Sequence, residues 1–259
     1  MPGTANRNIK LTVSYDGTQY SGFQIQPQAN TVQGELERAV FHLTGQSVKL
    51  TSSGRTDAGV HARCQVVNFE VNSSIPIDRW CLALNSRLPK DIVVHTAEEV
   101  PMEFHARRSA VSKTYRYSIQ RSKWANVMYR DSRLHHPGSL SLSAMEKALK
   151  QLEGTHDFTT FCSRRAAVVS HVRTIYSTSI VFEAEPMLGD GDAGVIHIYI
   201  QGNGFLYNMV RIIVGTLLQI GEGRRQPEEM GIILSAKNRS LAGPTALAHA
   251  LTLWDVQYE

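Results

Sequence analysis

The stretch VKLTSSGRTDAGVHARCQVVNFEV, residues 48–71, places a short polar turn between two apolar segments. Residues 48–52 and 64–71 alternate or run apolar with β-branched side chains, which predicts two strands. Gly54 and Gly59 bracket the turn between them. Because glycine has no Cβ, the backbone can take unusual torsion angles there or approach a ligand closely. The turn is therefore the first candidate for a functional loop.

Arg55 and Asp57 lie two residues apart within this turn, so in an extended segment their side chains point to the same side. A neighbouring guanidinium stabilises the charged form of a carboxylate. Asp57 is then suited to act as a nucleophile or a base rather than as an acid. The alternative for an isolated Arg-x-Asp triplet is a surface ion pair in an Asx-turn.

Hydrophobic periodicity outward from this turn predicts six elements in the first half of the chain. They are a strand at Ile9–Tyr15, a helix at Val32–Leu43, strands at Val48–Ser52 and Cys64–Val71, a helix at Ile77–Arg87 and a strand at Ile92–Thr96. Their order is β-α-β-β-α-β, the split βαβ arrangement.

The second half repeats this order of elements. It contains a strand at Ser112–Gln120, a helix at Ser143–Glu153, strands at Val172–Phe182 and Val195–Gln201, helices at Phe205–Ile220 and Pro227–Ser235, and a strand at Leu251–Tyr258. Ser143 with Glu146 has the pattern of a capping box. The sequence therefore predicts an α+β protein of two similar halves, residues 1–104 and 105–259.

Composition indicates a globular protein whose fold needs neither a disulfide nor a structural metal. The 259 residues are 42% hydrophobic and 19% charged. Cys64, Cys81 and Cys162 form no C-x-x-C pair, which favours free thiols in a reducing compartment. The start of the chain has no apolar signal segment, and Ile212–Leu218 is too short to span a membrane. We expect a cytoplasmic protein without membrane attachment.

The common cofactor-binding motifs are incomplete in this chain. Gly54 and Gly59 have the spacing of a P-loop, but Val60 and His61 replace its Lys-Ser/Thr pair. Residues 202–204 lack the third glycine of a dinucleotide fingerprint. The histidines show no H-x-x-x-H pair and no Cys/His cluster. We therefore expect no metal, no nucleotide and no organic cofactor.

Positive charge is concentrated between His105 and His135. The segment holds eight Lys or Arg and one acid, Asp131, so it carries +7 against +4 for the whole chain. Aromatic residues, Trp124 among them, lie between the cations. Basic groups neutralise phosphates and aromatic rings stack on unpaired bases, so the segment favours nucleic acid as a partner. The alternative is a strand with a solvated basic face.

The turn and four further strings together resemble the tRNA pseudouridine synthase A (TruA) family. Residues 54–62 resemble its G-R-T-D-x-G-V-H-A signature. The other matches are YDG at 15–17 with GFQ at 22–24, KTYRY at 113–117, EGTHDF at 153–158 and GFLYNMVR at 204–211. The strings occur in the family's order and cover nearly the whole chain.

The resemblance implies a pseudouridine synthase fold, in which two pseudo-symmetric, RRM- or ferredoxin-like β-α-β-β-α-β halves join their antiparallel sheets into one central sheet. It implies an isomerase that converts uridine to pseudouridine at positions 38, 39 and 40 of the tRNA anticodon stem-loop, without a cofactor and as a homodimer. The N-terminal half would carry the catalytic Asp loop, and the C-terminal half the Tyr strand and the Arg helix.

By resemblance, Asp57 is the nucleophile, while Tyr115, Arg55 and Arg211 bind the substrate. Tyr115 would pack on the target uracil, Arg55 would contact RNA, and Arg211 would aim at the carboxylate of Asp57. An aspartate with an ordinary pKa of about 3.9 is ionised at neutral pH and needs no partner base. The sequence leaves open whether Asp57 attacks C1′, adds to C6 or abstracts a ribose proton, and which tRNAs are preferred.

One departure from the family pattern lies near the end of the chain. Where the family has G-P-x-A-P-x-x-G-L, residues 243–251 read GPTALAHAL, with Leu247 for a proline and Ala250 for a glycine. We expect a loosened or re-routed loop that does not touch the catalytic groups. Two alternatives to the main interpretation stay open: a synthase acting on other RNA uridines, and a non-catalytic RNA-binding module.

Overall fold

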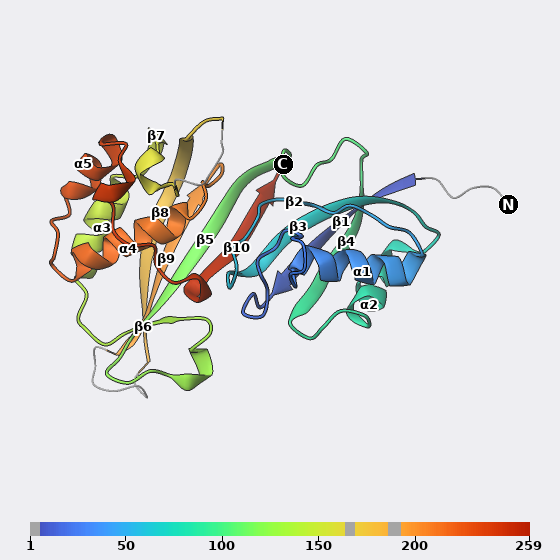
Figure 1. Cartoon of the computed structure of the whole chain (residues 1–259), viewed down its shortest axis with the longest axis horizontal. Helices are drawn as coiled ribbons and strands as arrows, with labels where there is room; N and C mark the ends of the chain where they lie inside the picture. The colour runs from blue at the N-terminus through green and yellow to red at the C-terminus, as the bar shows by residue number, and fades with distance from the viewer. Residues whose placement is uncertain (1–5, 164–168, 186–192) are drawn as a thin grey trace. The chain divides into compact units, whose positions relative to one another are not determined.

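The computed structural model describes residues 6–163, 169–185 and 193–259. The chain forms two compact units, one of Met1–Val111 with Thr252–Glu259 and one of Ser112–Leu251. Each unit combines helices with a sheet (Figure 1), so the predicted α+β class is confirmed. In the part of the chain that the structure describes, no helix is both long and apolar enough to cross a membrane.

The first unit is built on a four-strand order, β4-β1-β3-β10, with the short β2 paired to β3. Its elements are β1 (Asn6–Tyr15), α1 (Val32–Thr44), β2 (Thr51–Ser52), β3 (His61–Asn72), the 3-10 turn η1 (Ile77–Arg79), α2 (Trp80–Asn85), β4 (Ile92–Val100) and β10 (Leu251–Tyr258). β1 runs antiparallel to β3 and β4, whereas β10 runs parallel to β3. The helices α1 and α2 contact each other (Figure 1).

Alternating residues of β1 form the core of this unit. Ile9, Leu11 and Val13 are fully buried, as the two-residue period of a strand requires for one covered face. Helix α1 begins after Thr31, whose side chain accepts a hydrogen bond from the Gly34 N–H. It ends at Gly45 in the left-handed conformation, φ 73°.

The second unit has the strand order β5-β9-β8-β7, antiparallel throughout, with β6 parallel to β5. Its elements are β5 (Ala110–Arg121), η2 (Val127–Tyr129), β6 (Leu134–His136), α3 (Leu142–Lys150), β7 (Gly154–Asp157), η3 (Thr159–Phe161), β8 (Val172–Ala184), β9 (Gly194–Gly202), α4 (Met209–Gly221), α5 (Glu229–Ser235), η5 (Arg239–Leu241) and η6 (Ala248–Ala250). In chain order, β5, α3, β8, β9, α4 and β10 repeat the β-α-β-β-α-β pattern of the first half.

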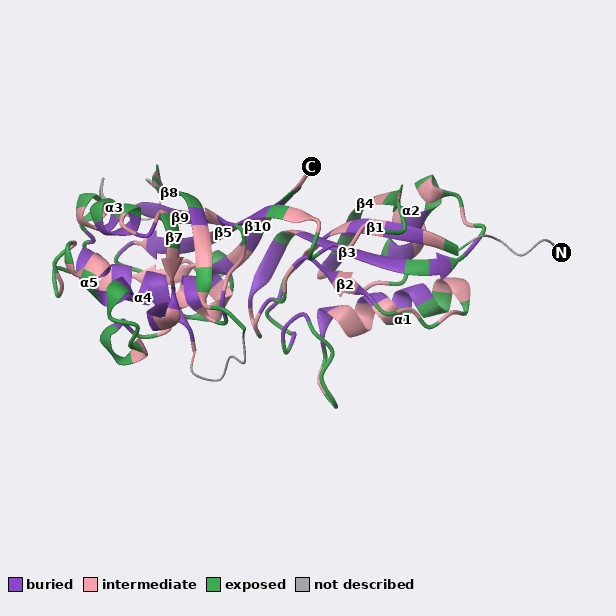
Figure 2. Ribbon diagram, turned by 90° about the horizontal axis from the view of Figure 1, so that it is seen from above, coloured by how far each residue is buried: buried purple, intermediate pink, exposed green. Residues whose placement is uncertain are grey.

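Helix α4 is the most buried helix of this unit (Figure 2). Its apolar stripe is buried along its length, at Met209, Val210, Ile213, Val214 and Leu217. Because α4 also contacts α3, its apolar side chains are covered by protein on more than one side.

Several element boundaries differ from the prediction, and three of the differences have a clear local cause. Helix α4 begins at Met209 instead of Phe205, because Asn208 is left-handed at φ 61° and interrupts the helix there. Helix α3 is capped by Ser141, whose hydroxyl accepts from the Ala144 N–H, so the predicted Ser143 cap is wrong. The strand predicted at residues 48–52 shrinks to Thr51–Ser52, because only these two residues pair with β3.

Candidate active site

Asp57 lies half-buried in the loop that joins β2 to β3. Its carbonyl accepts a hydrogen bond from the Val60 N–H at 3.1 Å, which closes a tight turn. Gly59 within the turn has φ 76°, a conformation that favours glycine. The unusual backbone angle expected of this glycine is therefore confirmed.

The segment 15–23 packs closely against this loop, main chain against main chain. Main-chain bonds run from the Phe23 N–H to the Thr56 carbonyl, 3.0 Å, and from the Gly59 N–H to the Tyr20 carbonyl, 3.3 Å. A Cβ on Gly17 would lie 2.1 Å from the Val60 carbonyl oxygen, and one on Gly22 would lie 2.8 Å from that of Thr56. Both glycines are thus required by close backbone approach to the Asp57 loop.

A buried side-chain network lies next to the loop and was not singled out by sequence reasoning. The Tyr15 hydroxyl is 2.7 Å from Oγ1 of Thr56, and Gln65 Nε2 donates to the Gly54 carbonyl at 2.8 Å. The Ser53 hydroxyl donates to Gln65 Oε1 at 2.7 Å. The available signal was Tyr15 itself, which ends an alternating apolar strand, because a buried phenol needs a hydrogen-bond partner.

Arg55 is exposed and does not form the ion pair with Asp57 that was the alternative for this triplet. Among the residues that the structure describes, neither it nor Arg107 or Arg108 has a carboxylate within ion-pair distance. Burial and the nearby charge of Arg55 lower the pKa of Arg107. Cations held close together without a counter-charge suit an anionic ligand such as a phosphate backbone.

Tyr115 lies on β5 with 8% of its surface exposed. Its ring meets Phe205 edge-on, with centroids 5.0 Å apart and an interplanar angle of 84°. Tyr117 and Ile119, on the same side of the strand, are fully buried. The ring of Tyr115 is thereby fixed at the margin of the core of its unit, where one edge can still reach a ligand.

Arg211 stands in the first turn of α4, where the helix dipole disfavours a cation. Its side chain turns to two oxygen acceptors: Nε donates to the Ala246 carbonyl at 2.8 Å, and NH1 donates to Asn208 Oδ1 at 2.9 Å. Asn208 in turn donates to the Ser163 hydroxyl at 3.0 Å. These bonds orient the planar guanidinium, so Arg211 is not a merely solvated side chain.

The segment 243–247 packs directly against α4. A Cβ on Gly215 would lie 1.8 Å from the Pro244 carbonyl oxygen, and the Gly243 N–H donates to Thr216 Oγ1 at 2.9 Å. Ala246 in this segment bonds Arg211 through both its carbonyl and its N–H, so the segment contacts a predicted substrate-binding residue.

The two departures from the family pattern fit the backbone at their positions. Leu247 has φ −61°, a value that proline also takes, and its carbonyl accepts from the Tyr117 hydroxyl at 3.0 Å. Ala250 is fully buried in the 3-10 turn η6. The main chain therefore does not need to be re-routed around either residue.

The basic segment divides into paired and unpaired cations. Arg133 lies 3.7 Å from the Tyr129 ring centroid and is bonded to Glu185 at 2.6 Å. Lys123 lies over the ring of Trp124, 5.3 Å from its centroid. Trp124 is 72% exposed, as expected of an aromatic ring available for contact with a partner.

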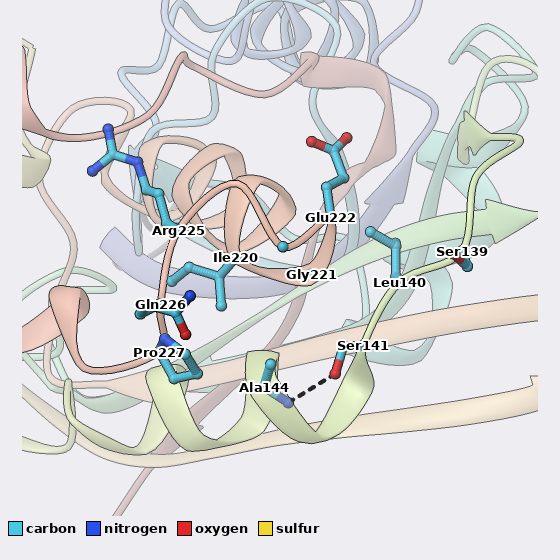
Figure 3. A pocket seen from close by; sticks show the side chains of 11 residues that line it. Ser139, Leu140, Ser141, Ala144, Ile220, Gly221, Glu222, Arg225, Gln226 and Pro227 are labelled. Atoms are coloured by element: carbon cyan, nitrogen blue, oxygen red, sulfur yellow. Dashed lines mark hydrogen bonds between the residues drawn. The ribbon is translucent and has the colours of Figure 1, made fainter.

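A pocket of about 490 Å³ opens in the second unit where α4 ends and α3 begins (Figure 3). Ser141, Glu222 and Arg225 are among its polar lining residues. Glu222 is engaged with His136 at 2.9 Å and also with Arg224. None of the four predicted site residues lines this pocket, so it is separate from the candidate site.

Comparison with known proteins assigns the chain to a family. A family model described as tRNA pseudouridine synthase matches residues 11–107 and 148–259. The tRNA pseudouridine synthase A of Anoxybacillus flavithermus is 51% identical over 98% of this chain and 99% of its own. That of Bacillus subtilis is 47% identical over 97% of this chain and 99% of its own. A solved Cbf5-Nop10-Gar1 complex covers 81% of this chain and 45% of its own, at 14% identity and a TM-score of 0.34.

The chain belongs to the tRNA pseudouridine synthase A family, and its fold is the pseudouridine synthase fold. It is therefore an isomerase, and tRNA is its substrate. The alternative of a non-catalytic RNA-binding module finds no support in these relatives.

Proposed function

We propose that the enzyme converts uridine to pseudouridine at positions 38, 39 and 40 of the tRNA anticodon stem-loop, in the cytoplasm, without a cofactor and with Asp57 as nucleophile. The observation that carries the role of Asp57 is its loop. The peptide groups on both sides of Asp57 are held by hydrogen bonds from Phe23 and Val60. A carboxylate held in this way is preorganised for attack.

The isomerisation breaks the bond between N1 of uracil and C1′ of ribose and forms a bond between C5 and C1′. C5 loses its hydrogen as a proton, and N1 gains a proton. Atoms and charge balance without an oxidant, a reductant or a group donor, so the side chains of the protein suffice as reactants. The target base must leave the stack to be reached, which costs a few kcal/mol.

The other site residues have roles that suit their surroundings. Tyr115 packs against the target uracil, and its hydroxyl serves proton transfer at C5. Arg55, which stands beside Arg107, binds the RNA backbone or occupies the space left by the flipped base. Arg211 contributes substrate binding through its oriented guanidinium. Contacts of these kinds offset the cost of flipping the base.

Tritium release from tRNA labelled at uridine C5 tests the chemistry, because pseudouridine formation expels the C5 hydrogen. We expect release by the wild type and none by Asp57→Asn, which keeps the size of the side chain and removes its charge. Asp78→Asn, an exposed carboxylate beside Arg79, is the matched control and should release at the wild-type rate. Equal release by Asp57→Asn and the wild type would disprove the role of Asp57.

Transcripts that carry uridine at only one of positions 38, 39 and 40 test which positions of the tRNA are modified. Release from each of them, and none when all three positions are cytidine, supports the proposed target. Undiminished release from the transcript without these uridines would point to another site in RNA.

We further propose that the enzyme works as a homodimer. The second unit exposes Trp124 by 72%, Val127 by 66% and Met128 by 81%, an apolar group that a second copy can cover. Light scattering of the wild type should give twice the 28.8 kDa chain mass, and Met128→Glu should shift the mass toward one chain. A monomeric wild type would refute the dimer.

A further inference from the structure

Four buried side chains form a hydrogen-bonded chain that ends at the neighbour of Asp57. Ser53 and Gln65 are fully buried, Tyr15 is 4% exposed and Thr56 is 6% exposed. The bonds run from Ser53 to Gln65, from Gln65 to Tyr15, and between Tyr15 and Thr56. Tyr15 comes from β1, Gln65 from β3, and Ser53 and Thr56 from the loop between β2 and β3.

Between Ser53 and Tyr15, the donors and acceptors of this chain have a definite direction. The Gly54 carbonyl can only accept, so it is faced by Nε2 of Gln65, at 2.8 Å. Oε1 of Gln65 accepts from the Ser53 hydroxyl, and Nε2 also reaches the Tyr15 oxygen at 3.4 Å. The Tyr15 hydroxyl, which keeps its own hydrogen, bonds Thr56 Oγ1 at 2.7 Å, and either oxygen can be the donor. Burial raises the pKa of Tyr15 to about 12, which keeps that hydrogen in place at any physiological pH.

Thr56 transmits this anchoring to Asp57, the next residue. Its side chain is tied to Tyr15 and its carbonyl to the Phe23 N–H, at 3.0 Å. Both the rotamer of Thr56 and the peptide that leads into Asp57 are thereby fixed. Without the phenol hydroxyl, Thr56 Oγ1 would have to find another partner, and the peptide would turn with it.

We propose that Tyr15 is a positioning residue whose hydroxyl, through Thr56, sets the orientation of the Asp57 carboxylate toward the substrate. This inference rests on the proposed role of Asp57 as nucleophile. It concerns the rate of the chemical step, because Tyr15 and Thr56 are buried beneath the loop. Displacing a reacting group by a fraction of an ångström lowers the rate and leaves substrate binding intact.

The first test compares kcat with KM for tRNA in four variants. Tyr15→Phe and Thr56→Val remove one hydroxyl each, and each should lower kcat about tenfold with KM within about twofold of wild type. Thr56→Ser restores the hydroxyl and should recover most of kcat. Thr178→Val is the matched control, since Thr178 is equally buried and donates a 2.7 Å bond to Glu153 in the second unit. Its kcat should stay at the wild-type value.

A double variant distinguishes a shared effect of Tyr15 and Thr56 on kcat from two independent losses of activity. Tyr15→Phe with Thr56→Val should be no slower than the slower single variant, because both substitutions break the same bond. Multiplied losses, or a kcat of Tyr15→Phe equal to that of Thr178→Val, would overturn the proposal. If Tyr15→Phe fails to fold, the comparison of Thr56→Val with Thr56→Ser still decides, because Val and Thr have the same shape.

A readout independent of turnover distinguishes this proposal from the proposed function. The NMR signal of the Asp57 side-chain carboxyl, followed through a pH titration, should move in Tyr15→Phe and Thr56→Val and not in Thr178→Val. An unmoved signal refutes positioning even where the enzyme is active. A moved signal in a protein that releases no tritium supports positioning and refutes the activity.

Discussion

The hydroxyl of Tyr15 lies 2.7 Å from Oγ1 of Thr56, and Thr56 directly precedes Asp57 in the chain. The last residue of β1 is thus bonded to the candidate catalytic loop 41 positions later. The YDG and GFQ strings and the GRTD string are therefore parts of one structure, in which segment 15–23 holds the loop that carries Asp57.

Because segment 15–23 packs closely against the Asp57 loop, the loss of stability on adding a methyl group to a glycine should depend on the position of that glycine. Gly22→Ala places a Cβ against the Thr56 carbonyl at φ 95°, and Gly45→Ala meets nothing within 4 Å at φ 73°. We expect Gly45→Ala to lower the free energy of unfolding by about 1–2 kcal/mol and to keep kcat. Gly22→Ala should lose more stability and most of its activity. Urea unfolding measures the stability of the two variants and tritium release their activity. Equal losses in both variants would contradict the close packing of segment 15–23 against the Asp57 loop.

Arg107 and Arg108, which have no carboxylate partner in the described part of the chain, predict a change in the salt dependence of binding. Replacing Arg107 and Arg108 together with alanine should weaken tRNA binding and reduce the slope of log K against log salt by about 0.7–0.9 for each phosphate that the variant no longer neutralises. Arg38→Ala is the control, because Arg38 is already paired with Glu35 at 3.0 Å. Filter binding across a salt series gives the slopes. If all three proteins share one slope, the RNA surface lies elsewhere.

Asn208 should separate backbone strain from the orientation of Arg211. Asn208→Gly accepts φ 61° but loses the bond to the Arg211 guanidinium, and Asn208→Ala loses the same bond and adds strain. We expect both variants to raise KM for tRNA about fivefold, the equivalent of roughly 1 kcal/mol. Only the alanine variant should show a marked fall in Tm. A glycine variant with wild-type KM would show that the bond is dispensable.

Leu247→Pro should stabilise the protein, because the native φ of −61° already suits proline. Because proline reduces the conformational freedom of the unfolded chain, the free energy of unfolding should rise by about 0.4–1 kcal/mol. Ala250→Gly, the other return to the family pattern, should instead destabilise by about 0.5–1 kcal/mol, since Ala250 is fully buried. Thermal unfolding of the two variants should thus give shifts of opposite sign.

Asp157 makes stability depend on acid pH. Hydrogen bonds from Thr159 and the Lys237 ammonium at 2.9 Å lower the pKa of Asp157 from 3.8 to about 2. Because the folded-state pKa is depressed, the stabilisation is present above pH 3.8 and is lost as the pH falls through about 2. The Tm difference between wild type and Asp157→Asn should therefore shrink between pH 4 and pH 2. A constant difference over this range would exclude the ionised carboxylate as its source.

Local sequence predicted most of the regular structure. Strand and helix periods depend only on neighbouring residues, so the strand at Leu251–Tyr258 and the helix from Val32 were located almost to the residue. The boundary at Asn208 could not be predicted in this way. Its left-handed conformation is held by bonds to Ser163 and Arg211, and the bond to Ser163 joins residues 45 positions apart.

The motifs of this sequence by themselves determined the family and the candidate residues Asp57, Arg55, Tyr115 and Arg211, because each candidate stands within a short string that resembles the family. Only the tertiary structure decided what holds them. The contacts of Tyr15 with Thr56 and of Arg211 with Ala246 join segments 41 and 35 positions apart. Such pairings depend on how the folded backbone packs, and no local pattern encodes that packing.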